Sequence, residues 1–129
     1  MEHRKLMILT LLSGATAVLL GAFGAHALKP YLDEVGQANF QTANRYHFYH
    51  TLLALFYILW NVNGRVVRLG SRSALIGIIL FCGSLYLLAL RSHFPDIPSW
   101  IGAITPLGGL LFVVAWGVGI RQLLQESKI

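Results

Sequence analysis

Four long apolar runs divide the chain, and each is close to the roughly 20 residues that a helix needs to cross a bilayer. They cover about residues 6–28, 46–62, 73–90 and 100–120, and each ends at a basic residue or an Asn-Gly pair. Helices are expected because lipid offers no partner for exposed backbone groups. The pattern therefore predicts an all-α membrane protein with four transmembrane helices in a compact bundle.

The segment between the first two runs is more polar and is not expected to cross the membrane. Pro30 can open a helix, and Asp33 and Glu34 suit its first turn. Four apolar positions could form one stripe along such a helix: Tyr31, Leu32, Val35 and Ala38. We therefore expect a short amphipathic helix over about residues 31–43 that lies on the membrane surface.

The composition supports one integral membrane domain over residues 1–129. Hydrophobic residues make up 56% of the chain and charged residues 12%, against about 25% charged in a typical soluble domain. A length of 129 residues suits a single compact unit. The lipid bilayer is accordingly the first partner that the sequence predicts.

The positive charge follows the ends of the apolar runs. Seven of the ten Lys and Arg residues lie at the two chain ends and between the second and third runs. The scattering of these cations argues against a basic patch for nucleic acid, despite the net charge of +5. Because Lys and Arg favour cytoplasmic loops, we expect both termini in the cytoplasm.

Small residues mark the faces along which the helices are expected to pack. Helices in lipid associate by close packing of such residues. The first run has four at four-residue spacing, and the fourth has an adjacent glycine pair: Ser13, Ala17, Gly21, Ala25, Gly108 and Gly109. We interpret these as packing seams, with a groove for a substrate as the alternative.

The stretch Arg45-Tyr46-His47-Phe48-Tyr49-His50 carries the candidate chemistry. His47 and His50 are three residues apart and share a helix face. In the expected topology they lie near the outer membrane face, together with His26, Arg45 and Thr105. His50 is expected to face the bundle interior and to approach His26.

This cluster has several possible roles. His26 and His50 could hold a metal or haem, with His47 as a further ligand, and Arg45 suits a lipid phosphate. The structural interpretation is that the histidines make hydrogen bonds between helices. Proton transport is disfavoured because the runs carry no Asp, Glu, Lys or Arg at mid-depth. No hydrolytic triad or phosphate-binding motif is present, so we expect no enzyme and no cofactor.

Four motifs link the chain to a known family: GAFGAHAL (21–28), FQTANRYHFYHTLLAL (40–55), GSLYLLAL (83–90) and ITPLGGLLFVVAW (104–116). Together they resemble the membrane family called domain of unknown function 423, whose eukaryotic relative is transmembrane protein 256. The resemblance implies a multi-pass protein of the bacterial inner membrane with no assigned activity. It also implies that His26 and His50 are recurring histidines, and that glutamine also occurs at the position of His47.

The sequence thus favours a non-enzymatic accessory or assembly component of a larger membrane complex or a homo-oligomer. The glycine-rich faces motivate this, because they offer more close-packing surface than four helices need. The alternative is an outer-face histidine and arginine site for a metal, haem or anionic lipid. A small-solute channel or transporter is a third possibility, which would require a continuous polar path.

Overall fold

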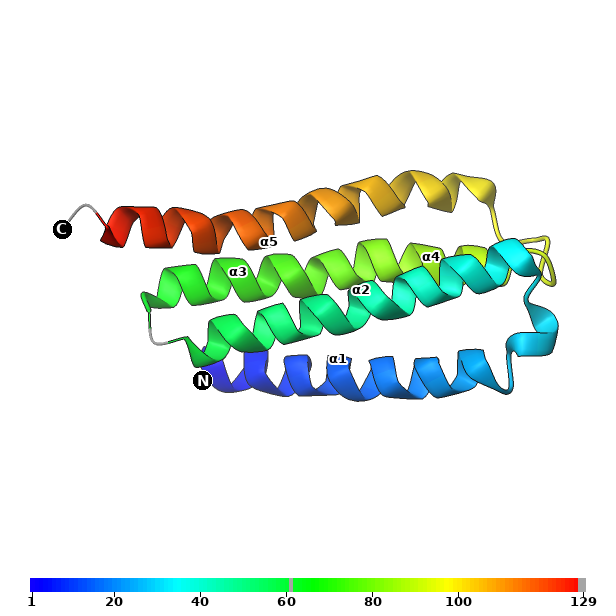
Figure 1. Cartoon of the computed structure of the whole chain (residues 1–129), viewed down its shortest axis with the longest axis horizontal. Coiled ribbons are helices and arrows are strands. Elements are labelled where there is room, and N and C mark those ends of the chain that lie inside the picture. The colour runs from blue at the N-terminus through cyan, green and yellow to red at the C-terminus, as the bar shows by residue number, and fades with distance from the viewer. Residues whose placement is uncertain (61, 128–129) are drawn as a thin grey trace.

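The structure, a computed structural model, describes residues 1–60 and 62–127, and it forms an elongated helical bundle (Figure 1). Four helical rods run side by side, the third of them made of three consecutive segments. The rods are α1 (Glu2–Ala25), α2 (Glu34–Leu59), α3 (Gly64–Gly77) with a π-helical turn (Ile78–Cys82) and α4 (Gly83–Ala89), and α5 (Ile104–Glu126). Short 3-10 turns at Lys29–Tyr31 and Ser99–Ala103 precede α2 and α5.

Three of these rods are long and apolar enough to cross a membrane. They are Glu2–Ala25, Gly64–Ala89 and Ser99–Glu126. Their outward faces are apolar: Leu19 is 61% exposed and Val113 is 67% exposed. Water-soluble proteins rarely leave such large apolar surfaces uncovered. The expectation of an all-helical membrane protein is therefore confirmed.

The segment after α1 does not form the separate surface helix expected over residues 31–43. Tyr31 ends a 3-10 turn, and α2 then runs without a break from Glu34 to Leu59. Asp33 caps this helix, because its Oδ1 accepts a hydrogen bond from the Gly36 N–H at 2.7 Å. The polar residues that suggested a break at about residue 45 remain helical.

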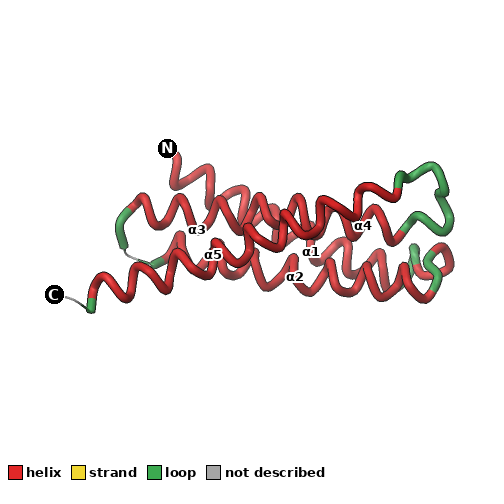
Figure 2. Tube along the Cα trace, turned by 90° about the horizontal axis from the view of Figure 1, so that it is seen from above, coloured by secondary structure: helices red, strands yellow, loops and turns green. Residues whose placement is uncertain are grey.

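The third rod also starts earlier than its apolar run. α3 begins at Gly64, nine residues before the expected start near residue 73. Asn63 caps it, since its Oδ1 accepts from the Arg65 N–H at 2.8 Å. α2 ends and α3 begins at the same end of the bundle, which Figure 2 shows from above.

The helices approach one another most closely at small residues. A Cβ atom added to Gly108 of α5 would lie 2.3 Å from the backbone nitrogen of Phe81 in the π-helical turn. A Cβ on Gly70 of α3 would lie 2.5 Å from the ring of Tyr57 in α2. These contacts hold the third rod against α5 at Gly108 and against α2 at Gly70.

α1 and α2 are antiparallel neighbours over most of their length (Figure 1). The His3 ring contacts the Ile58 carbonyl oxygen at 3.1 Å near one end of the pair. Gly24 packs against Phe40 near the other end. In addition, α1 begins and α5 ends at the same end of the bundle (Figure 1).

Candidate functional site

A hydrogen-bonded network centred on His47 joins three helices in the bundle interior. The His47 side chain is only 4% exposed. Its Nε2 lies 3.1 Å from Ser13 Oγ on α1, and its Nδ1 lies 3.2 Å from the Tyr86 hydroxyl on α4. Ser13 Oγ is also 2.8 Å from Thr51 Oγ1.

Asn44 extends this network by one turn of α2. Its Nδ2 donates to the Ala17 carbonyl oxygen at 2.9 Å and to the Tyr86 hydroxyl at 3.1 Å. Both amide hydrogens are therefore used. We refer to Ser13, Asn44, His47, Thr51 and Tyr86 as the His47 network.

The chemistry of the donors gives the His47 network a consistent direction. An amide nitrogen can only donate, so Asn44 donates to the Tyr86 oxygen. The Tyr86 O–H then donates to Nδ1 of His47, and the Nε2–H of His47 donates to Ser13. Ser13 in turn donates to Thr51. A neutral His47 thus satisfies every bond in this arrangement.

His50 is buried separately, against α5 rather than α1. Its Nε2 accepts from the indole N–H of Trp116 at 3.2 Å. An indole nitrogen only donates, so Nδ1 must carry the imidazole hydrogen, which it gives to the Tyr46 carbonyl oxygen at 2.8 Å. The ring also stacks on Phe112, with centroids 3.4 Å apart. Both ring nitrogens of His50 are therefore occupied by protein groups.

The structure does not bring His26 and His50 together. His26 follows the last residue of α1 and is exposed. Gly24 packs against Phe40, and His50 lies ten residues farther along α2, a distance of about 15 Å. Within residues 1–60 and 62–127, no three His, Cys, Asp or Glu side chains are grouped so that they could hold a metal ion.

The other two members of the candidate cluster also lie apart. Thr105 is half-buried, and its Oγ1 lies 2.6 Å from Ser84 Oγ on α4, so it joins α4 to α5. Arg45 is exposed on the outer surface of α2.

The small residues proposed as packing seams occupy varied surroundings. Ala17 is fully buried, and a Cβ on Gly21 would lie 3.0 Å from Asn44 Oδ1. Ser13 belongs to the His47 network, whereas Ala25 is exposed. Gly108 touches Phe81 closely, but a Cβ on Gly109 would lie 3.7 Å from the nearest Phe81 atom. Sequence spacing alone does not separate these two kinds of position.

Sequence reasoning did not single out Asn44, Tyr86 or Trp116 as site residues. A usable signal was present for Asn44 and Tyr86, because polar side chains within apolar helices need partners inside the bundle. The polar sequence around Asn44 instead predicts a surface segment. Trp116 carried no special signal, since tryptophan is also common at membrane interfaces.

Arg45 lies at a depth where the neighbouring helices are apolar. The residue before it, Asn44, bonds to Ala17 within α1. The residue after it, Tyr46, stacks on two rings, with centroid distances of 4.9 Å to Phe81 and 6.2 Å to Phe112. Those contacts lie inside all three of the rods that could cross a membrane.

Residues 20–109 match the family described as protein of unknown function DUF423. The match covers well over half of the chain. The chain belongs to the DUF423 family. This confirms the resemblance drawn from the four sequence motifs.

Relatives of this DUF423 protein carry names that describe their location. A UPF0382 membrane protein of Haemophilus influenzae is 39% identical, with 87% of each chain covered. UPF0382 membrane protein YwdK of Bacillus subtilis is 36% identical over 85% of this chain and 88% of its own. UPF0382 inner membrane protein YgdD of Escherichia coli is 34% identical over 92% of this chain and 88% of its own. No solved structure matches the chain.

Proposed function

We propose that this DUF423 protein is a non-enzymatic accessory subunit of a membrane assembly, and that the Arg45 side of α2 is its docking face. The observation that carries the proposal is the position of Arg45. Its side chain is exposed, yet the residues on either side of it contact the interior of three apolar rods.

The proposed topology has four crossings, with α2 as the fourth and both termini in the cytoplasm. Contacts between α1 and α2 extend from His3 and Ile58 to Gly24 and Phe40, which supports an α2 that crosses with α1. An even number of crossings agrees with α1 beginning where α5 ends. The positive-inside rule supports the orientation, and the name of the Escherichia coli relative supports the inner membrane.

In this topology Arg45 faces lipid inside the bilayer. Eleven residues, or about 16 Å, separate it from the first residue of α2. A charged side chain well inside the hydrocarbon layer costs roughly 2.5 to 3.5 kcal/mol on insertion scales, and such residues are usually paired within proteins. No acidic side chain among the described residues forms an ion pair with it. A partner helix that carries a carboxylate would neutralise it.

The partner is proposed to be a different polypeptide. The five acidic residues of this chain all lie at or beyond helix ends: Glu2, Asp33, Glu34, Asp96 and Glu126. A second copy would therefore offer Arg45 no carboxylate at the same depth. Exposed Gln41, one turn before Arg45, adds an amide to the same face.

The interior polar groups support a structural role rather than transport or catalysis. The side chains of the His47 network bond to one another and to the Ala17 carbonyl group. His50 bonds to the Trp116 indole and to the Tyr46 carbonyl group. No buried side-chain nitrogen or oxygen atom in the described part of the chain lacks a partner. A substrate or ion would have to displace these bonds, whereas interhelical bonds of this kind fix helix register.

The test is photo-crosslinking in native membranes. A photoreactive residue replaces Gln41 or Tyr49, which flank Arg45 on the exposed face of α2, and Val113 of α5 serves as the control position. We expect a discrete protein adduct from positions 41 and 49 that persists in Arg45→Lys and is lost in Arg45→Glu. The captured polypeptide should carry an acidic residue in a transmembrane segment.

Three results would contradict the proposal. One is an equal adduct yield from Val113, which would indicate random collisions. Another is an adduct that Arg45→Glu leaves unchanged. The third is an adduct with the mass of two identical chains, which would replace the partner protein by a homo-oligomer.

A further inference from the structure

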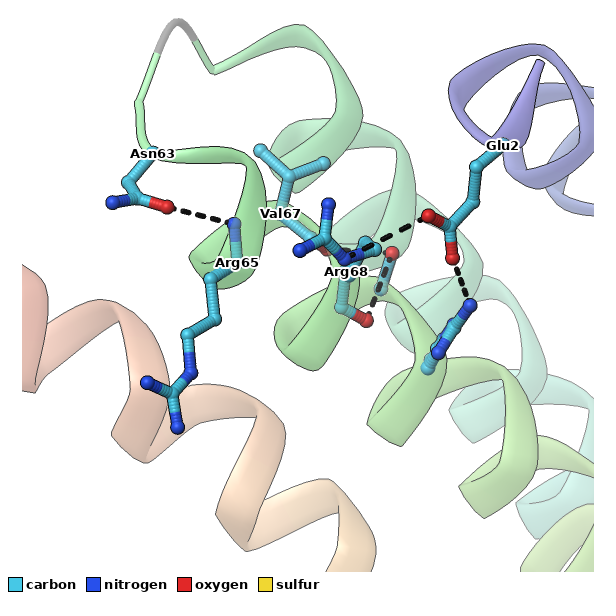
Figure 3. A network of polar contacts seen from close by, with 7 residues as sticks. Glu2, Asn63, Arg65, Val67 and Arg68 are labelled. Atoms are coloured by element: carbon cyan, nitrogen blue, oxygen red, sulfur yellow. Dashed lines mark hydrogen bonds and ion pairs between the residues drawn. The ribbon is translucent and has the colours of Figure 1, made fainter.

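The arginines at the start of α3 are divided between two surroundings. Arg68 and Arg72 both form ion pairs with Glu2 of α1. Arg65 has no acidic partner among the described residues, and Figure 3 shows its side chain extending away from Glu2 toward a neighbouring helix.

Arg65 and Arg121 line a common cleft between the start of α3 and the end of α5. The cleft has a volume of about 320 Å³. Asn63 and Gln125 contribute further polar groups near the end of the bundle. The apolar lining residues are Val66, Leu69 and Val118. Leu69 and Val118 lie farther from the end of the bundle than the two arginines do.

The lining is thus layered along the helix axes. Arg65 is one turn nearer the helix end than Leu69, and Arg121 is nearly one turn nearer than Val118. Leu69 is 50% exposed, so the apolar layer is open to the surroundings of the bundle. A ligand that fits this cleft has an anionic group at one end and a hydrocarbon portion at the other.

We propose that this cleft binds an anionic phospholipid, with its phosphate between Arg65 and Arg121 and an acyl chain against Leu69 and Val118. The planar guanidinium group presents paired N–H donors that match phosphate oxygens. Basic pockets between transmembrane helices at the cytoplasmic side are suited to lipid headgroups. The cleft does not involve Arg45 and is independent of the proposed docking face.

Both arginines line the cleft, whereas the acidic residue beside it does not. Glu126 lies one turn beyond Gln122, and its Oε1 accepts from Gln122 Nε2 at 2.8 Å. Glu126 is not among the lining residues, whereas both arginines are. The two positive charges therefore dominate the rim of the cleft.

The experiment measures lipid binding to the full chain by native mass spectrometry in detergent, with phosphatidylglycerol or phosphatidylcholine added. The variant is Arg65→Gln with Arg121→Gln. The matched control is Arg4→Gln with Lys5→Gln, which removes two exposed charges at the same end of the bundle. We expect phosphatidylglycerol to bind in preference to phosphatidylcholine. The cleft variant should bind it on the order of 10- to 30-fold more weakly, and the control should bind normally.

A competition with millimolar glycerol phosphate separates a lipid from a soluble phosphate ester. Failure to displace phosphatidylglycerol supports a lipid, whereas displacement overturns it in favour of a soluble ligand. Equal losses in the cleft and control variants would overturn the site, since they would report only net charge. Unchanged binding in the cleft variant, with a native unfolding midpoint, would do the same.

Discussion

Asn44 and Arg45 are adjacent on α2 and have opposite surroundings. Asn44 faces inward, where both hydrogens of its amide bond to α1 and α4. Arg45 faces outward and pairs with no acid in the described residues. Two neighbouring residues thus differ in that the fold supplies hydrogen-bond partners for Asn44 but no acidic partner for Arg45.

If α2 crosses the membrane as proposed, polar groups on this helix have two different roles. Inward polar groups, such as the His47 network, specify which helices meet and in what register. Outward polar groups at the same depth contribute nothing to that register and carry a cost in lipid. An outward polar group therefore indicates a partner more strongly than an inward one does.

The largest change in stability is expected at a second adjacent pair in α5, where Gly108 is buried and Gly109 is partly exposed. Gly108→Ala would place its Cβ 2.3 Å from the Phe81 backbone nitrogen, which should lower the free energy of unfolding by about 2 to 3 kcal/mol. Gly109→Ala meets nothing closer than 3.7 Å and should be neutral or stabilising by up to about 1 kcal/mol. Unfolding by SDS in mixed micelles, followed by circular dichroism, measures both. Equal effects would show that the helices are not this closely packed.

A smaller loss is expected when the centre of the His47 network is removed. His47→Leu leaves Ser13 and Tyr86 without their ring partner, which should cost about 1 to 2 kcal/mol. His47→Gln retains both a donor and an acceptor and should cost less than about 1 kcal/mol. The same unfolding assay tests both variants. A glutamine variant as unstable as the leucine variant would argue against hydrogen bonding as the role of His47.

The smallest change in stability is expected at the pair that opened the comparison. Asn44→Leu should destabilise the isolated chain by about 1 kcal/mol, because it removes two interhelical bonds. Arg45→Leu should change it by less than about 0.5 kcal/mol. The crosslinked adduct should respond in the opposite order, with Arg45→Leu reducing it more than Asn44→Leu. A clear destabilisation by Arg45→Leu would mean that Arg45 serves this chain's own fold.

The sequence predicted the apolar rods because length and hydropathy are local properties. The start of α2 was missed for a non-local reason. Asn44 remains in a helix beside α1 because Ala17 and Tyr86 supply its hydrogen-bond partners, and both are far away in the sequence. The polar composition of about residues 31–43 predicts a surface helix, whereas α2 buries Gly36, Phe40 and Ala43 within this segment.

For the candidate site, the burial of the histidines could be predicted from the sequence, but their hydrogen-bond partners could not. The burial of His50 followed from the cost of exposing imidazole to lipid, and the structure buries both His47 and His50. Their partners could not be read from spacing, since His47 bonds toward α1 and α4 while His50 bonds toward α5. His26 shared only an expected membrane side with them, and depth along the bundle separates it from both.

The antiparallel pairing of α1 and α2 bears on how the chain is inserted during synthesis. α1 emerges from the ribosome first and is apolar over most of its length. α2 follows with Asn44, His47 and Thr51. Each of them is hydrogen-bonded to α1, Asn44 through the Ala17 carbonyl group and the other two through Ser13. In the proposed topology, α2 would meet lipid with these groups unsatisfied if α1 had already diffused away. The two helices are therefore expected to leave the insertion machinery together, as a hairpin in which α1 supplies the hydrogen-bond partners of α2.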